Sequence, residues 1–253
     1  MKACVLASGS KGNSTYIETG KLKFLVDIGP SCAYIERSLR KIGVEPSSID
    51  MIFITHTHVD HVGGLRVFIK KYHTKVYMTE KMHSELTIDV NNYCYIDSDI
   101  LIGDLEVVPI KTSHDVLESH GYVFTSLGRS ICLITDTGYI HIKNFNKLKD
   151  KNLYIFESNH DIRMLREGKY PYHLQQRILS DRGHLSNKDS AYYLSKFVTS
   201  NTKKIVLIHL SEENNTPSLA VDTLINTLKD KNVIVPEIEV AKQKEISEFM
   251  EVW

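Results

Sequence analysis

Cysteine is scarce in this chain and is never clustered. The 253 residues contain four, namely Cys4, Cys32, Cys94 and Cys132, and no two of them have Cys-x-x-Cys spacing. The sequence therefore offers no disulfide framework, which is typical of a reducing compartment. Cys4 and Cys132 lie in apolar, strand-like runs, where we expect small buried thiols. From this usage we expect a cytoplasmic protein.

Long apolar runs and a net charge are missing as well. No stretch approaches the ~20 apolar residues that span a bilayer, and the apolar run near the N-terminus is too short for the core of a signal peptide. We therefore expect a soluble protein without a membrane partner. Lys plus Arg and Asp plus Glu number 31 each, so no overall field attracts polyanions, and a nucleic-acid substrate would need a local basic patch.

Predicted strands and helices alternate along the whole chain. Short β-branched runs predict strands at residues 4–6, 15–18, 24–26, 51–54, 75–78, 105–110, 121–125, 130–134, 153–156 and 204–208. Apolar residues at helical spacing predict helices between Ser31 and Gly43 and at residues 65–72, 162–167, 174–179, 188–197 and 218–228. Because no linker or repeat interrupts this alternation, we predict one layered α/β domain over residues 1–253.

The chemistry is concentrated in His-Thr-His-Val-Asp-His, residues 56–61, directly after a predicted buried strand. Alternate residues His56 and His58 can converge on one ion, while Asp60 and His61 turn towards a second ion beside it. Imidazole and carboxylate ligands suit Zn²⁺, Mn²⁺ or Fe²⁺. The alternative, a solvated histidine-rich loop, is weakened by the partners that follow.

Three further candidate ligands stand where later strands end. His114 follows the strand that ends at Ile110, Asp136 follows the strand that ends at Ile134, and His209 ends the last predicted strand. One such histidine is more often an ordinary polar residue, but three recurrences behind the first motif are not plausibly accidental. We predict two divalent metal ions, Zn²⁺ or Mn²⁺ first and Fe²⁺ as a further candidate. The first ion is assigned to His56, His58 and His114, the second to Asp60, His61 and His209, and Asp136 bridges them.

With this ligand order the chain resembles the metallo-β-lactamase superfamily, and the resemblance spans essentially the whole sequence. It implies an αββα sandwich, in which two mixed β-sheets are flanked by helices, and a hydrolase. The motif is equally at home in glyoxalase II-like thioesterases. It disfavours redox diiron members, which would have Glu where His58 stands, and zinc β-lactamases, which usually have Cys where Asp136 stands.

Segments outside the ligands resemble the YycJ (WalJ) family, which is regarded as a family of DNA-directed exonucleases. They are residues 8–14, 157–161, 170–172, 177–187 and 209–217. The segments around Glu157 and His184 are also similar to the branch that contains ribonuclease Z and to PhnP-type phosphodiesterases. In those branches a histidine at the position of His184 contacts the scissile phosphate. One departure is Ser119-His120, where the family tends to have proline, and we expect His120 in a surface loop rather than at a metal.

Three residues have predicted catalytic roles. Asp60 orients or deprotonates the attacking water, His184 protonates the leaving oxygen or stabilises phosphate charge, and Glu157 fixes the tautomer of His184. The alternative for His184 is a polar residue at a helix entry, because Ser186 or Asn187 can cap the next helix. His160 and His173 have no predicted role.

Substrate contacts are predicted in two places, in addition to His184. The loop at residues 8–14, with Ser8, Ser10 and Asn13, either presents backbone amides to a phosphate or is a tight connection between strands. Residues 163–188 carry basic side chains throughout, Arg182 among them, with Tyr170 and Tyr172 in between. They either bind DNA phosphates and bases or form a solvated helical face.

The leading hypothesis is a metal-dependent exonuclease that acts on DNA. A phosphodiesterase for cyclic or mononucleotide-sized esters needs only the metal ligands and His184, and would show a narrow, less basic pocket. A glyoxalase II-like thioesterase normally adds a C-terminal helical region, for which the residues after His209 offer too few helical positions. A non-catalytic metal-retaining module is disfavoured, because every ligand position is filled.

Overall fold

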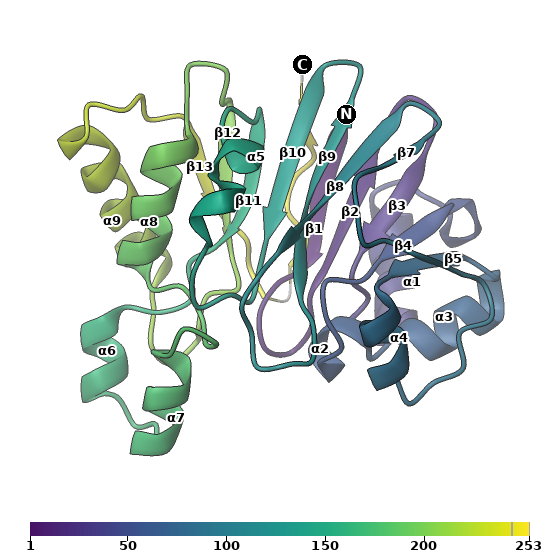
Figure 1. Ribbon diagram of the computed structural model, residues 1–253, viewed down its shortest axis with the longest axis horizontal. Helices are drawn as coiled ribbons and strands as arrows, with labels where there is room; N and C mark the ends of the chain where they lie inside the picture. The colour runs from purple at the N-terminus through teal and green to yellow at the C-terminus, as the bar shows by residue number, and fades with distance from the viewer. Residues whose placement is uncertain (244, 253) are drawn as a thin grey trace.

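Two seven-stranded sheets form the centre of the computed structural model, which describes residues 1–243 and 245–252 (Figure 1). The first sheet contains β1 (Lys2–Ala7), β2 (Ser14–Glu18), β3 (Lys23–Val26), β4 (Met51–Phe53), β5 (Lys75–Met78), β6 (Tyr93–Tyr95) and β14 (Met250–Glu251). The second contains β7 (Ile100–Ile102), β8 (Leu105–Lys111), β9 (His120–Ser126), β10 (Arg129–Ile134), β11 (Leu153–Glu157), β12 (Lys204–Ile208) and β13 (Glu237–Val240).

Both sheets are mixed, and each is half antiparallel and half parallel. The first has the order β14-β1-β2-β3-β4-β5-β6, antiparallel up to β3 and parallel from β3 to β6. The second has the order β13-β12-β11-β10-β9-β8-β7, parallel from β13 to β10 and antiparallel from there to β7. Parallel strands end at the same edge of a sheet, so the loops after β3, β4, β10, β11 and β12 can meet at one edge of the sandwich.

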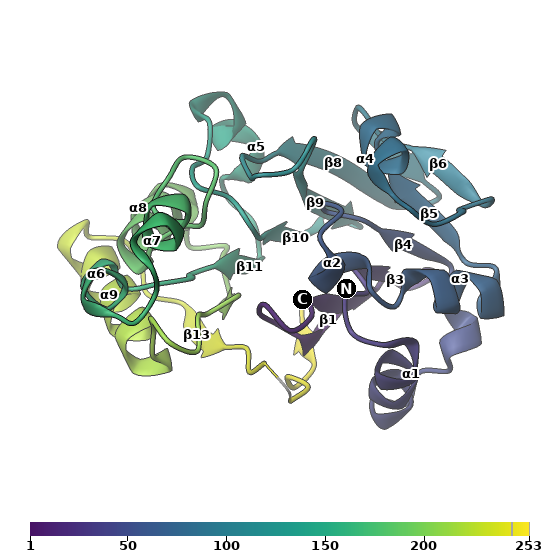
Figure 2. The same ribbon diagram turned by 90° about the horizontal axis from the view of Figure 1, so that it is seen from below.

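Helices cover the outer faces of both sheets (Figures 1 and 2). On the first sheet lie α1 (Cys32–Lys41), α3 (Leu65–Tyr72) and α4 (Glu80–Glu85), while the short α2 (Val59–Val62) lies at the bottom edge of the sandwich in Figure 1. On the second lie α5 (Phe145–Leu148), α8 (Asn187–Phe197) and α9 (Pro217–Asp230), while α6 (Ile162–Glu167) and α7 (Tyr172–Ile178) extend below it in Figure 1. Short 3-10 turns occupy Pro46–Ser48 and Ile142–Asn144. The predicted αββα sandwich is confirmed, and Ser31 caps α1 by accepting the Tyr34 N–H.

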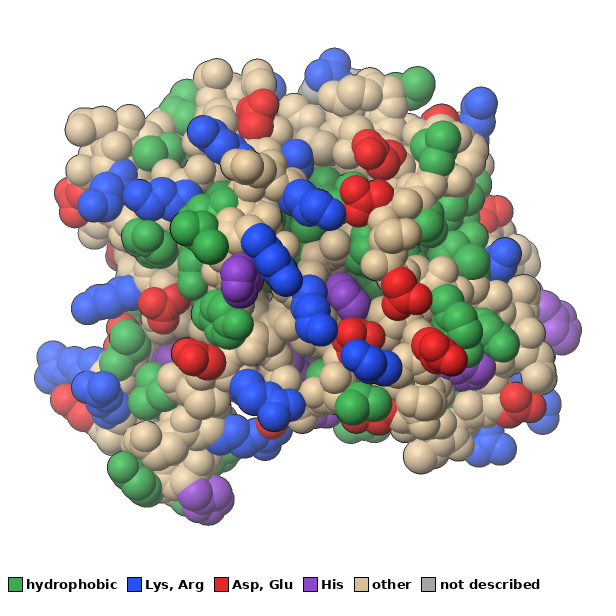
Figure 3. All heavy atoms as spheres, viewed as in Figure 1, with side chains coloured by type: hydrophobic (Ala, Val, Ile, Leu, Met, Phe, Trp, Pro, Cys, Tyr) green, Lys and Arg blue, Asp and Glu red, His purple; other side chains and the backbone are tan. Residues whose placement is uncertain are grey.

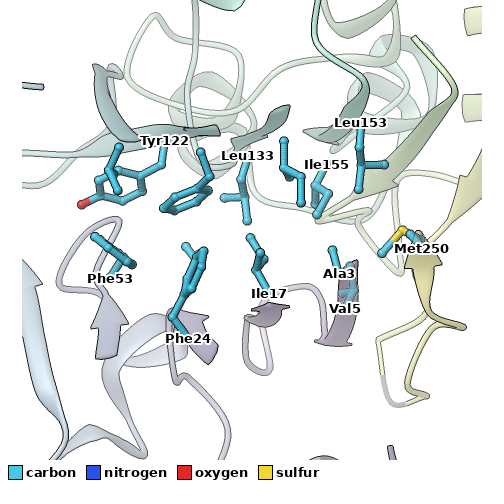
Figure 4. Close-up of a cluster of buried hydrophobic side chains, with 14 of the residues drawn as sticks. Ala3, Val5, Ile17, Phe24, Phe53, Tyr122, Leu133, Leu153, Ile155 and Met250 are labelled. Atoms are coloured by element: carbon cyan, nitrogen blue, oxygen red, sulfur yellow. The ribbon is translucent and has the colours of Figure 1, made fainter. Parts of the chain in front are cut away.

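The core has three apolar layers, one between the sheets and one beneath the helices on either side. The middle layer is rich in aromatic rings, with Phe24 and Phe124 centroids 4.9 Å apart and Phe53 and Tyr122 centroids 5.6 Å apart. Figure 4 shows inward side chains of this layer, Phe24, Phe53 and Tyr122 among them, meeting between the sheets. This packing fixes the positions of the strand ends of the two sheets relative to one another. Within the described residues, no helix is long and apolar enough to cross a membrane.

Candidate metal centre

The His-rich segment leaves β4 and enters α2 in close contact with the loop that follows β3. Gly63 and Gly64 have ordinary right-handed helical backbones, so they are not required for a tight turn. They are required for close approach, because a Cβ on Gly64 would lie 2.2 Å from the Pro30 carbonyl oxygen. A Cβ on Gly29 would lie 1.6 Å from the Asp60 carbonyl oxygen. The two loops therefore form one tightly packed unit.

The predicted ligands lie together in two triplets. The candidate ligand atoms of His56, His58 and His114 lie within 4.8 Å of one another, and so do those of Asp60, His61 and His209. His56 Nε2 and His58 Nδ1 are 3.2 Å apart. These are the same two triplets that the sequence predicts, drawn from loops after β4, β8 and β12. The structure thus brings all six side chains to one edge of the sandwich.

Asp136 lies between the two triplets. Its Oδ2 is 3.2 Å from His61 Nε2, and its Oδ1 is 3.5 Å from His209 Nε2 and 3.8 Å from His114 Nε2. The side chain is buried, and it follows β10 with a left-handed backbone, φ 49°. Asp27 and His209 follow β3 and β12 with φ 61° and 57°. Left-handed backbones are uncommon for residues other than glycine and cluster at functional sites.

Most of the imidazoles are held from behind by a second partner. His61 Nδ1 donates to Asp27 Oδ2 at 2.7 Å, and His114 Nδ1 donates to the Gly183 carbonyl at 3.1 Å. Thr55 Oγ1 donates to Asp27 Oδ2 at 2.7 Å, so it accepts from His56 Nδ1 at 3.1 Å. Such partners fix ring orientation and raise ligand basicity. Asp27 and Thr55 were not predicted, although Asp27 directly follows a predicted strand and Asp136 comes two residues after one.

His58 has the longest of these contacts. Its Nε2 lies 3.7 Å from Asp115 Oδ1, which is also 3.3 Å from His114 Nε2. The other carboxylate oxygen of Asp115 binds the guanidinium of Arg177 on α7. Asp115 therefore links the first triplet to α7. It was not predicted either, although it directly follows the predicted ligand His114.

The donor set fits divalent cations. His209 Nε2 is buried and has no hydrogen-bond partner in the described part of the chain. Burial lowers the pKa of His209, but Asp136, Asp60 and Glu157 outweigh it and raise that pKa to about 10. Burial raises the pKa of Asp136, yet His209 and His61 hold it well below its usual range. Because the carboxylates stay charged, cations are needed to balance them. Metal ions compete with protons for the lone pairs of the imidazoles and carboxylates. The clusters are thus consistent with a dinuclear centre.

Glu157 and His184 form a pair beside the two triplets. Glu157 is fully buried at the end of β11, and its Oε1 accepts from His184 Nδ1 at 2.7 Å. Its Oε2 accepts the backbone N–H groups of Thr137 at 3.1 Å and Leu185 at 3.0 Å. Burial raises the pKa of Glu157, but the charge and hydrogen bond of His184 outweigh it and bring that pKa to about 2. The helix cap is Ser186, which accepts the Asp189 N–H.

The loop between β1 and β2 uses most of its polar groups internally. Ser8 Oγ accepts the His209 N–H at 2.8 Å, and Asn13 Nδ2 lies 2.9 Å from His61 Nε2 and 3.2 Å from Asp60 Oδ2. The Gly9 amide donates to Asn13 Oδ1 and the Asn13 amide to the Asp60 carbonyl. Of this loop, Ser10 lines the cavity. These bonds favour the tight connection over an amide cradle for phosphate.

Part of the basic segment is engaged within the protein. Arg182 donates from Nε to the His114 carbonyl at 3.2 Å and from Nη2 to the Val116 carbonyl at 3.1 Å. Arg163 Nε pairs with Glu167 Oε1 at 3.0 Å. Figure 3 shows Lys and Arg interspersed with Asp and Glu at the lower left, where α6 and α7 lie. The segment is therefore mixed in charge, which favours the solvated face for most of it.

The remaining histidines lie outside the described metal clusters. The surface-loop prediction for His120 is wrong, because His120 begins β9, is 8% exposed and donates its N–H to the Thr55 carbonyl. His160 is buried, and its carbonyl accepts the Asn187 N–H. His173 lies exposed on α7.

A cavity of about 230 Å³ opens onto the centre. Among its lining residues, we call His114, His184 and His209 the floor, and Tyr170, Leu174 and Ile178, in or just before α7, the wall. Glu212 and Glu213 also line the cavity. The cavity therefore joins both triplets and the Glu157–His184 pair to one opening.

Comparison with known proteins places these features in context. The family model of the Metallo-beta-lactamase superfamily matches residues 7–139. Exodeoxyribonuclease YycJ of Bacillus anthracis is 38% identical over 240 residues, covering 92% of this chain and 91% of its own. Exodeoxyribonuclease WalJ of Streptococcus pneumoniae is 40% identical, covering 90% and 88%. The solved structure of YhfI from Bacillus subtilis, a metallo-β-lactamase fold protein, superposes with a TM-score of 0.70 at 17% identity, covering 98% and 99% of the two chains.

Proposed function

The chain belongs to the metallo-β-lactamase superfamily, and we propose that within it the protein is a phosphodiester hydrolase that digests DNA from an end. The observation that carries the proposal is the Glu157–His184 contact of 2.7 Å beside two His/Asp triplets. Similarity to exodeoxyribonucleases over about nine-tenths of the chain supports DNA as the substrate.

Two divalent ions would be held by the triplets and bridged by Asp136. When bound, such ions supply Lewis-acid stabilisation of a phosphoryl oxygen and lower the pKa of water from 15.7 to about 7. We propose that Asp60, whose Oδ2 lies 3.6 Å from His61 Nε2, orients or deprotonates the attacking water. Zn²⁺ and Mn²⁺ suit this donor set, with Fe²⁺ as a further candidate.

His184 would assist departure of the leaving oxygen. Because its Nδ1 donates to Glu157, its Nε2 is the nitrogen left to meet substrate. The ionised Glu157 stabilises the doubly protonated imidazole, which can protonate the leaving oxygen or balance phosphate charge. Burial of Glu157 behind two backbone N–H groups keeps this carboxylate in place.

The test is a panel of substrates with Mn²⁺ and with Zn²⁺. It contains bis-p-nitrophenyl phosphate, end-labelled single-stranded and duplex DNA, closed circular DNA, RNA and S-lactoylglutathione. We expect nucleotides to be released from DNA ends and closed circles to survive. Hydrolysis of the thioester alone would overturn the proposal.

A second candidate, a phosphodiesterase for cyclic or mononucleotide-sized esters, is favoured by the cavity. Its volume of about 230 Å³ lies below the range of drug-sized sites, and the guanidinium groups of Arg177 and Arg182 are already bonded within the protein. Adding cyclic nucleotides to the panel separates the two candidates. Turnover of cyclic nucleotides with intact DNA would favour the second.

A further inference from the structure

Helix α7 presents an apolar face to the cavity instead of to the core. No residue of α7 is buried in the described structure. Leu174 and Ile178 stand one turn apart, are half-buried and line the cavity together with Tyr170. Neither is among the described members of the three apolar core layers. An apolar stripe left at a cavity wall fits an apolar ligand group.

The surrounding charges argue against a second phosphate at this wall. The Arg177 guanidinium is bound to Asp115, and the Arg182 guanidinium to two backbone carbonyls. Glu212 and Glu213 also line the cavity, and the Glu212 carboxylate is paired with Lys11 Nζ at 2.5 Å. The carboxylate of Glu213 therefore disfavours a second phosphate here and offers an acceptor to a neutral group with N–H donors on its edge. The anion belongs at the floor, beside His184.

We propose that the wall binds the nucleobase of the nucleotide whose phosphate lies at the floor. This inference rests on the proposed phosphodiester hydrolase function and names the part of the substrate that the cavity selects. A nucleobase is flat and apolar on its faces, so it can stack on Tyr170 and pack against Leu174 and Ile178. An N–H group on its edge, such as N3–H of thymine, can donate to the Glu213 carboxylate, as the amino group of cytosine does to Glu elsewhere.

The experiment compares a nucleotide with the same molecule lacking its base. Metal-loaded, full-length protein is titrated by calorimetry with thymidine 5′-monophosphate and with 2-deoxyribose 5-phosphate. We expect the nucleotide to bind roughly tenfold more tightly, because one stacked base contributes on that order. In a Tyr170→Ala/Leu174→Ala variant this preference should disappear while the affinity for the sugar phosphate stays the same. Equal affinities in the wild type, or equal weakening of both ligands in the variant, would overturn the inference.

A matched control and a kinetic readout complete the test. Tyr192→Ala, on α8 and 47% exposed, should leave both affinities unchanged. With thymidine 5′-(p-nitrophenyl phosphate), the double variant should raise KM roughly tenfold, with no change for methyl p-nitrophenyl phosphate. If neither ester is hydrolysed but the nucleotide preference persists, the hydrolase function fails and the base site stands. If both esters are hydrolysed without a nucleotide preference, the base site fails alone.

Discussion

The floor and the wall of the same cavity are built in opposite ways. At the floor, His114 and His209 are buried, and partners such as Gly183 for His114 and Glu157 for His184 fix the orientation of the rings. At the wall, no residue of α7 is buried, and the apolar side chains of Leu174 and Ile178 line the cavity. The floor geometry is thus determined by many contacts and the wall geometry by few. Catalysis requires side chains held in a fixed geometry, as at the floor. A less constrained wall can adapt to different substrates.

The largest expected effect is at the centre of the floor. Asp136→Ala removes the carboxylate that lies within 3.8 Å of nitrogens from both triplets. We expect metal content to fall and hydrolysis to drop at least about a thousandfold, because several kcal/mol of charge stabilisation is lost with the ions. Elemental analysis and initial rates measure the two effects. Asp222→Ala, exposed on α9, is the control, and an Asp136→Ala protein that keeps both ions and its rate would contradict the bridging role.

Next in size is the Glu157–His184 pair. His184→Ala should keep its metal but lose about 10²- to 10⁴-fold in the rate of DNA hydrolysis. The loss should be far smaller for methyl p-nitrophenyl phosphate, because p-nitrophenolate leaves without protonation. Glu157→Gln should follow the same pattern more weakly. Equal losses on both substrates would exclude proton donation to the leaving oxygen and leave His184 a role in binding the phosphate.

The carboxylates behind the ligands give an intermediate effect on metal affinity. Asp27→Asn should weaken binding at the second triplet about 10- to 100-fold, since Asp27 is 2.7 Å from His61 Nδ1. Asp115→Asn should act on the first triplet and by less, because its contact to His58 Nε2 is 3.7 Å. Competition with a chelator measures both affinities. If Asp115→Asn weakened metal binding more than Asp27→Asn does, the Asp115–Arg177 contact would hold the metal site more strongly than the contact between Asp27 and His61.

Much of the fold follows from local sequence, because its inner strands are short apolar runs that end at turns. The predicted strand at 130–134 and the helix at 162–167 lie within or match β10 and α6. Strands β6, β7, β13 and β14 were not predicted, since each has only two to four residues and lies at or beside the edge of a sheet. His120 was misplaced because β9 begins one residue before the predicted strand at 121–125. His120 pairs there with Lys111 of β8, and the local sequence does not reveal this pairing.

The site divides in the same way. Residues 56–61 carry four candidate ligands within one hexapeptide, so their spacing alone predicts a metal centre. Asp27 and Asp115 act through partners 34 and 62 positions away, His61 and Arg177, and only the folded chain brings them together. Ser8 and Asn13 were predicted to touch substrate, and this stays a prediction. In the structure their side chains contact the His209 N–H and His61 Nε2, and the local sequence does not reveal these contacts.

The smallest expected effect compares one leucine of the core with one of the wall. Leu185 follows His184, is fully buried and packs beneath α8, so Leu185→Ala should lower the free energy of unfolding by about 2–5 kcal/mol. Leu174→Ala removes the same atoms from a half-exposed site outside the core and should change it by no more than about 0.5 kcal/mol. Urea unfolding of metal-free protein isolates the apolar term, because no ion then contributes to stability. If Leu174→Ala costs as much as Leu185→Ala, the wall is part of the core, and its apolar face is occupied by the protein itself and is not free for a substrate.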